Sequence, residues 1–262
     1  MSPPPPAPNG PLLTLSGVSK SYNGDTPAVA DVSLSIERGS FVSLVGPSGC
    51  GKSTLLRLIA GLLQPSHGTL DWEDGERPND LGFVFQDATL LPWASAFDNV
   101  YLPLKLKGLS RDDADRRVKD ALARVGLADA SDKLPRELSG GMRMRVSIAR
   151  ALVTEPPVLL MDEPFAALDE FTREKLDDDL LTLWRDLGWT VIFVTHSVYE
   201  SVYLSERILV MSSGSHGSGG PGQIADDVRI DAPYPRGLPF RQSSAYFDHC
   251  KGVSTALRDG DA

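Results

Sequence analysis

The chain of 262 residues has little cysteine and fewer basic than acidic side chains. Its two cysteines, Cys50 and Cys250, are too few and too far apart for a disulfide framework, which favours a reducing, cytosolic setting. Lys and Arg number 26 against 35 Asp and Glu, so the formal net charge is −9. This balance argues against duplex nucleic acid as the main partner, although it leaves room for a local basic patch.

Long apolar runs are also missing. The longest, Leu55–Leu63, is interrupted by Arg57 and falls far short of the roughly 18–20 apolar residues of a membrane span. The first residues, "MSPPPPAPNGP", have neither the basic nor the apolar region of a signal peptide, and we expect a disordered, polyproline-like tail over residues 1–11. If the protein works at a membrane, another chain must hold it there.

What is present is an ordinary globular composition, 41% hydrophobic and 23% charged, in which short apolar runs alternate with helical patterns. Several of these runs are apolar on successive residues, which predicts strands covered on both faces of a parallel sheet. The alternation predicts an α/β fold. We expect strands over residues 41–45, 81–85, 158–161, 190–194 and 207–211, and helices over 53–63, 110–125 and 170–187.

The remaining segments fall outside this alternation. Residues 90–155 contain no convincing strand and predict a helical insertion, while the Gly/Ser-rich composition of residues 213–222 predicts a flexible loop. The last segment, 223–262, holds one short β-like piece, "VRID", followed by Pro-rich and amphipathic stretches. We therefore divide the chain into a tail, a main domain over 12–212, the loop and a C-terminal extension.

The stretch "GPSGCGKS" (Gly46–Ser53) matches the phosphate-loop pattern G-x-x-x-x-G-K-[ST]. A predicted strand precedes it and a predicted helix follows, so backbone N–H groups can cradle phosphate oxygens. Lys52 would neutralise the β- and γ-phosphates, and the Ser53 hydroxyl would ligate Mg²⁺. The plain alternative is a glycine-rich turn with a solvated lysine. Cys50 is most simply a small loop residue.

Polar residues also end two other predicted strands. Asp162 and Glu163 follow "VLLM", and His196 follows "TVIFVT". Ligands of parallel α/β sheets bind at the carboxyl ends of strands, where Asp162 could hold Mg²⁺, Glu163 could polarise an attacking water, and His196 could bond a γ-phosphate. The alternatives are a solvated carboxylate pair and a structural histidine.

The stretch "LSGGMRMRVSIARAL" (Leu138–Leu152) predicts a helix capped by Ser139, with Met144, Ile148, Ala151 and Leu152 on its buried face. Glycines inside a helix cost roughly 1 kcal/mol each relative to alanine. Gly140 and Gly141 therefore indicate a close approach to the backbone.

In this order the motifs resemble those of the ATP-binding subunits of ABC transporters, over residues 12 to about 212. "GPSGCGKST" resembles the Walker A motif, Gln86 the Q-loop, "LSGGM" the signature, "VLLMDEP" Walker B, Asp169 in "AALD" the D-loop, and His196 the switch histidine. The resemblance implies a P-loop NTPase core, with a RecA-like sheet, an N-terminal antiparallel β subdomain and a helical insertion subdomain. Met142 departs from the glutamine that many members carry.

The resemblance also implies roles for single residues. Glu163, His196, Gln86 and Lys52 would be catalytic, and Ser53, Gln86 and Asp162 would hold Mg²⁺. Tyr22, which could equally be a core tyrosine, would stack on adenine. ATP would be bound by Tyr22, Gly46, Pro47, Ser48, Gly49, Cys50, Gly51, Lys52, Ser53, Thr54 and, from a second subunit, by Ser139, Gly140, Gly141 and Asp169.

The segments "LLPWASAFDNV", "LSGGMRMRVSIARAL" and "DEPFAALDE" resemble the nitrate/sulfonate/taurine importer subgroup more narrowly. This implies an ATPase that drives uptake of a small anionic solute. Its partners would be a second ATP-binding subunit, a membrane permease and, indirectly, an extracytoplasmic binding protein, at the cytoplasmic face of the inner membrane. A Gly/Ser-rich insertion near "GGPGQI" departs from that subgroup.

Two other function classes stay open from the residues. A soluble ABC ATPase serving a cofactor-assembly scaffold or another non-transport complex would share every motif. A small-molecule P-loop kinase would explain Walker A but neither "LSGGM" nor the pair Asp162 and Glu163. Within "QDATLLPWASAFDNV", Trp93 either packs the insertion onto the core or anchors a permease helix.

Overall fold

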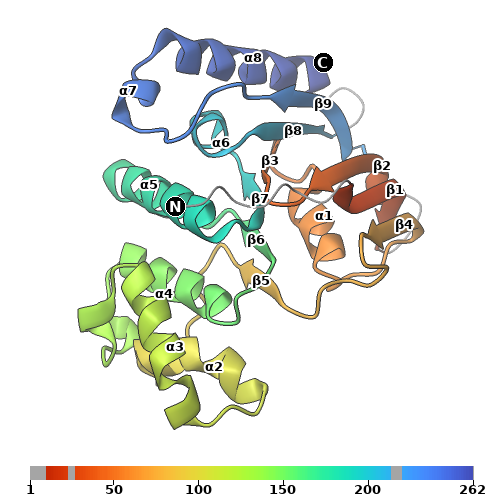
Figure 1. The fold of residues 1–262 in the computed structure, drawn as a ribbon. Helices are drawn as coiled ribbons and strands as arrows, with labels where there is room; N and C mark the ends of the chain where they lie inside the picture. Colours follow the sequence, from red (N-terminus) through yellow and green to blue (C-terminus); the bar gives the residue numbers. More distant parts are fainter. Residues whose placement is uncertain (1–9, 23–26, 214–219, 262) are drawn as a thin grey trace. The chain divides into compact units, whose positions relative to one another are not determined.

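The computed structural model describes residues 10–22, 27–213 and 220–261. Most of the predicted tail and the centre of the predicted Gly/Ser loop lie outside these residues. The chain forms two compact units, Met1–Pro78 with Gly188–Ala262 (the first unit) and Asn79–Leu187 (the second unit). Each unit is described by itself below, with the labels of Figure 1.

The first unit begins with an antiparallel sheet in the order β2-β1-β4. Its strands are β1 Pro11–Ser21, β2 Pro27–Glu37 and β4 His67–Trp72. The side chains of Leu13, Leu15 and Val18 on β1 are at most 1% exposed, so one face of this sheet belongs to the core. The antiparallel β subdomain that the resemblance implied is present.

The same unit contains β3 Phe41–Val45, β7 Thr190–Thr195 and β8 Arg207–Ser212, with β7 and β8 pairing in parallel with β3. All residues of β3 and β7 are buried, as their mostly apolar sequences predicted, and the burial includes the polar Ser43, Thr190 and Thr195. β9 Gln223–Arg229 pairs antiparallel with β8. This last strand begins earlier than the predicted "VRID" piece, because its pairing with β8 extends back to Gln223.

The helices of the first unit are α1 Lys52–Ile59, α6 Val198–Leu204, α7 Leu238–Arg241 and α8 Ser244–Asp261. The helix predicted over 53–63 ends four residues early. Gly61 has a φ of 68°, the left-handed conformation that commonly follows a helix end, and the Leu62 and Leu63 amides both donate to the Arg57 carbonyl.

The C-terminal extension packs within the first unit. The buried Arg236 guanidinium donates to the carbonyls of Val202, Tyr203 and Ser205 at the end of α6, at 2.9–3.0 Å. The Tyr246 hydroxyl on α8 donates to the Tyr199 carbonyl on α6 at 2.9 Å. The Arg236 bonds satisfy carbonyls that the C-terminal end of a short helix leaves without partners.

The second unit contains the parallel pair β5 Leu81–Val84 and β6 Val158–Asp162 and a group of helices (Figure 1). The helices are α2 Ala96–Leu106, α3 Arg111–Arg124, α4 Gly140–Leu152 and α5 Glu170–Leu187, with short 3₁₀ turns at Ala128–Ala130 and Pro135–Glu137. No strand occurs between residues 90 and 155, all of which the structure describes. The helical insertion is therefore confirmed.

Helix caps and buried stripes agree with the sequence patterns here. The hydroxyls of Ser110 and Ser139 accept hydrogen bonds from the amides of Asp113 and Met142 and cap α3 and α4. The four residues predicted for the inner face of α4, Met144, Ile148, Ala151 and Leu152, are buried, and so are Ala114, Val118, Ala121 and Leu122 of α3. In the ranges that the structure describes, no helix is both long and apolar enough to cross a bilayer.

Candidate active site

The phosphate loop joins β3 to α1 in the first unit. Gly49 and Gly51 have φ angles of 86° and 92°, which glycine adopts without steric cost. A Cβ atom on Gly51 would lie 2.6 Å from Val29 Cγ2 and 2.8 Å from the Ala28 carbonyl, whereas one on Gly49 would meet nothing within 4 Å. The loop is therefore packed on the Gly51 side and open at Gly49.

The side chain of Lys52 folds back over this loop. Its ammonium donates to the carbonyls of Gly46 at 2.8 Å and Pro47 at 2.9 Å, and the residue is 5% exposed. A buried cation satisfied by its own loop, at the first residue of a helix, suits an incoming anion. The close-packed glycines and the buried ammonium thus fit a nucleotide phosphate chain.

Two further predicted residues belong to the same unit. Val45 and Thr195 are parallel partners at the ends of β3 and β7, so the phosphate loop and the exposed His196 leave the sheet at the same edge. Tyr22 is 53% exposed and its hydroxyl lies 3.3 Å from the Thr54 hydroxyl. Tyr22 is therefore not a core tyrosine, and its ring is accessible to a ligand.

Gln86, Asp162 and Glu163 lie at one edge of the β5–β6 strand pair in the second unit. Val84 of β5 pairs with Met161 of β6, so the residues that follow leave the two strands at the same edge. Asp162 is 6% exposed and Gln86 is exposed. Their carboxylate and amide oxygens are ligands of the kind that Mg²⁺ prefers.

Glu163 has a φ of 47°. A non-glycine residue in the left-handed region is uncommon, and such strain clusters at active sites. The observation singles out Glu163 among the acidic residues of this edge.

The signature segment and Asp169 are neighbours in the second unit. A Cβ on Gly140 would lie 3.5 Å from Leu168 Cδ2, and one on Gly141 would lie 2.7 Å from Thr172 Cγ2. Asp169 accepts a hydrogen bond from the Thr172 amide at 3.0 Å, and hydrogen bonds from Thr172 lower the pKa of its carboxyl. Packing within this chain thus already requires glycine at position 141, whereas Gly140 is exposed.

Sequence reasoning missed the contact between the phosphate loop and the β8–β9 connection. A Cβ on Gly222 would lie 1.8 Å from the Cys50 carbonyl, and one on Gly46 would lie 2.5 Å from the Met211 carbonyl. Gly222 also exchanges backbone hydrogen bonds with β2, from its amide to Ala28 and from the Ala30 amide to its carbonyl. The "GPG" tripeptide marked a turn, but no local signal indicated what it touches.

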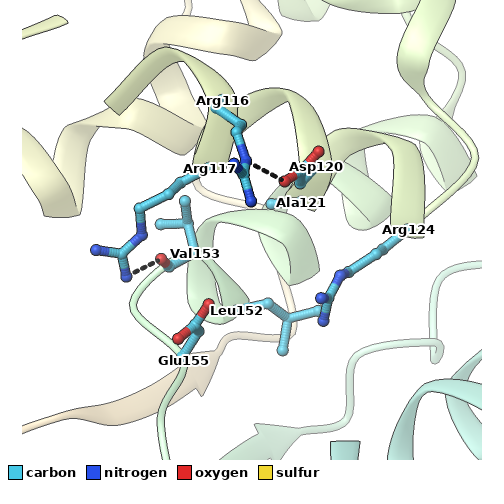
Figure 2. A pocket seen from close by; sticks show the side chains of 8 residues that line it. All are labelled: Arg116, Arg117, Asp120, Ala121, Arg124, Leu152, Val153 and Glu155. Carbon is cyan, nitrogen blue, oxygen red and sulfur yellow. Dashed lines mark hydrogen bonds and ion pairs between the residues drawn. The ribbon is translucent and has the colours of Figure 1, made fainter. Parts of the chain in front are cut away.

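A groove of about 440 Å³ on the second unit contains none of the predicted site residues. It is lined by α3 and the end of α4, with Arg117 donating to the Val153 carbonyl at 3.1 Å (Figure 2). The groove is lined by both positively and negatively charged side chains, and two of them, Arg116 and Asp120, form an ion pair. It does not contribute to the site described above.

Comparisons with known proteins agree with the motif order. The profile of the ABC transporter family matches residues 29–166. The aliphatic sulfonates import ATP-binding protein SsuB of Rhodopseudomonas palustris is 46% identical over 86% of this chain and 76% of its own length. The taurine import ATP-binding protein TauB of Yersinia pestis is 44% identical over 88% and 89%.

A solved structure is similar as well. It is the dimeric post-hydrolysis state of the ATP-binding cassette MJ0796 bound to ADP and Pi, which is 32% identical to this chain. The match covers 84% of this chain and all of that one, with a TM-score of 0.72. With the phosphate loop, the strand-end carboxylates and the capped signature helix in place, these matches show that the chain belongs to the ABC transporter family, among its ATP-binding subunits.

Proposed function

We propose that this protein is the ATP-hydrolysing subunit of an ABC importer and drives uptake of a small anionic solute through a separate membrane permease. The observation that carries the proposal is the pairing of strand ends. One pair presents the phosphate loop with His196, and the other presents Gln86 with Asp162 and Glu163. The importer role is supported by relatives named for sulfonate and taurine import.

In this proposal the first unit holds the nucleotide. The loop residues Gly46–Thr54 cradle the phosphates, and Lys52 exchanges its two carbonyl partners for phosphate oxygens. The exposed ring of Tyr22 stacks on adenine, held beside the loop by its contact with Thr54. Ser53 supplies a hydroxyl ligand for Mg²⁺, which neutralises phosphate charge when it is bound.

The second unit supplies the hydrolytic residues. Glu163 accepts a proton from the attacking water, Gln86 orients that water, and Asp162 helps to hold Mg²⁺. His196 of the first unit donates to the γ-phosphate. The assignment of these residues to one nucleotide rests on the family's motif order, which this chain repeats.

We further propose a homodimer in which the signature segment of one subunit completes the site of the other. Ser139 and the exposed Gly140 lie at the N-terminus of α4, where backbone amides favour an anion. Asp169, next to this segment, would belong to the same contact. The similarity to a dimeric cassette supports this arrangement.

Partners and location follow from the importer role. We place the protein at the cytoplasmic face of the inner membrane, held there by the permease, with an extracytoplasmic binding protein delivering the solute. Affinity purification from its own cells tests this. A co-purifying membrane permease supports the importer, whereas a co-purifying soluble scaffold would favour the non-transport ABC ATPase.

The chemistry is tested by two variants. Glu163→Gln keeps the size of the side chain and should retain ATP binding while turnover falls by about 10²-fold or more, the contribution of a general base. Lys52→Ala should weaken both binding and hydrolysis. Near-normal phosphate release by Glu163→Gln removes Glu163 from the mechanism, and transfer of phosphate to an acceptor instead of its release would indicate a kinase.

A further inference from the structure

The backbone that follows Gln86 is held by two polar side chains from other parts of the second unit. The first is Asn99 on α2, which is fully buried. Its Oδ1 accepts from the Leu91 amide at 2.7 Å, and its Nδ2 donates to the carbonyls of Leu91 at 3.2 Å and of Ala94 and Ser95 at 3.0 Å. One side chain therefore satisfies backbone groups over five residues.

The second is Arg150 near the end of α4. Its Nη1 donates to the Thr89 carbonyl at 2.9 Å, and its Nη2 donates to the Ala88 carbonyl at 2.9 Å and the Thr89 hydroxyl at 3.0 Å. Burial lowers the pKa of this guanidinium, which stays protonated at neutral pH because an arginine pKa lies so far above it. The Arg150 guanidinium thus donates hydrogen bonds to the carbonyls of Thr89 and Ala88, which lie 61 and 62 residues away in the sequence.

These bonds meet at a strained residue. Thr89 has a φ of 45°, which is a genuine outlier for a β-branched side chain. Such a conformation persists only where its surroundings hold it. Arg150 bonds both the carbonyl and the hydroxyl of this residue, so it is the group best placed to do so.

The helix that carries Arg150 is also the helix that Ser139 caps. α4 is continuous from Gly140 to Leu152, so one hydrogen-bonded helix joins Ser139 to Arg150. Its N-terminal end carries the signature residues, and its C-terminal end holds the residues that follow Gln86.

We propose that Arg150 is a positioning residue that holds Ala88 and Thr89 in their strained conformation and thereby couples Gln86 to the signature helix α4. A shift of α4 then displaces Gln86, and a shift of the segment 88–95 displaces the signature. Asn99 keeps the rest of that segment rigid, so it transmits displacement along its length. The proposal rests on the proposed function for its consequence, since it presumes that Gln86 and Ser139 act on ATP.

The bonding itself is tested without ATP, by amide hydrogen exchange on the full chain. In Arg150→Gln, the amides of residues 88–90, which Asn99 does not hold, should exchange at least ten-fold faster than in the wild type. The matched control is Arg145→Gln, since Arg145 lies on the same helix but donates to the Val125 carbonyl and to Asp179 instead. In the control, exchange of this segment should stay within two-fold of the wild type. Unchanged exchange in Arg150→Gln would overturn the proposal.

The consequence for catalysis is tested by steady-state kinetics with a rescue. Arg150→Gln should lower kcat about ten-fold and leave the KM for ATP within three-fold, because Gln86 is displaced and the phosphate loop is not. Asparagine adopts the left-handed conformation more readily than threonine. The double variant, Arg150→Gln with Thr89→Asn, should therefore have a kcat at least three-fold higher than that of Arg150→Gln alone.

The outcomes separate the two proposals. If the double variant is no faster than Arg150→Gln, Arg150 does not act through the conformation of Thr89 and the coupling is wrong. If Arg150→Gln does not fold, Arg150→Lys serves in its place, since a lysine ammonium cannot reproduce the planar two-carbonyl contact. If the wild type hydrolyses no ATP, the proposed function fails, while the exchange result still decides whether Arg150 holds the segment.

Discussion

Trp93 lies between β5 and α2 and is 76% exposed, so it does not pack the insertion onto a core. Trp93→Ala should therefore cost the isolated subunit little stability. A tryptophan can bury up to about 250 Å², and a quarter of that area at about 25 cal/mol per Å² is worth at most about 1.5 kcal/mol. The exposed three quarters would be worth about 4.7 kcal/mol if a permease helix covered them completely.

Because most of the Trp93 side chain is exposed, its removal should affect permease binding more than folding. The thermal melt of Trp93→Ala should shift by only a few degrees and basal ATPase should stay within a few-fold of the wild type. Binding to the permease in a pull-down should fall about 30-fold or more, the loss expected for a hot-spot aromatic of about 2 kcal/mol, and solute-stimulated hydrolysis should disappear.

Two controls separate interface from core. Trp189 is 6% exposed, so Trp189→Ala should destabilise the fold by about 3–5 kcal/mol. Phe247, 54% exposed on α8, offers another accessible aromatic, and Phe247→Ala should leave permease binding unchanged. A Trp93→Ala subunit that melts like Trp189→Ala but still binds the permease would refute the reasoning.

Three further predictions concern other parts of the chain. Ser139→Arg should leave ATP binding by the monomer intact and abolish ATP-driven dimerisation, and normal dimerisation of that inactive variant by size-exclusion chromatography would contradict the shared site. Gly222→Ala puts a methyl group 1.8 Å from a phosphate-loop carbonyl, so it should raise the KM for ATP and cost about 1–3 kcal/mol of stability. The control is Gly252→Ala, whose methyl group meets nothing within 4 Å and should stabilise α8 by about 0.5–1 kcal/mol. Asp227 is half exposed and paired with Arg207 at 2.6–2.7 Å, which lowers its pKa in the folded state, so Asp227→Asn should cost at most about 1 kcal/mol at pH 7. That contribution is complete above the unfolded pKa of about 4 and is lost as the pH falls through the lower folded value, so urea melts of the two proteins should converge at acid pH.

Much of the fold and the site could be predicted from the sequence because the signals are local. The strands β3, β6 and β7 are mostly apolar runs, and α3 and α4 carry their serine caps and buried stripes within a few turns of chain. The phosphate loop needs only consecutive residues, since its glycines and Lys52 act within one turn. Such features depend on conformations and periods that a short stretch of residues determines by itself.

Only the tertiary structure decided which residues meet across long separations. Gly141 has to be glycine because Thr172 approaches it, and Gly222 because the phosphate loop does. The third arginine of "MRMRVSIARAL", Arg150, is an ordinary helix residue by sequence, yet it bonds carbonyls of Ala88 and Thr89. The sequence around Trp93 fits both a core residue and an interface residue, and only the 76% exposure of its side chain in the fold argues against the core. The spacing of apolar residues in the sequence shows which face of a helix or strand is apolar, but not what that face contacts. Close contacts depend on the folded geometry, because residues far apart in the sequence are brought together only by packing.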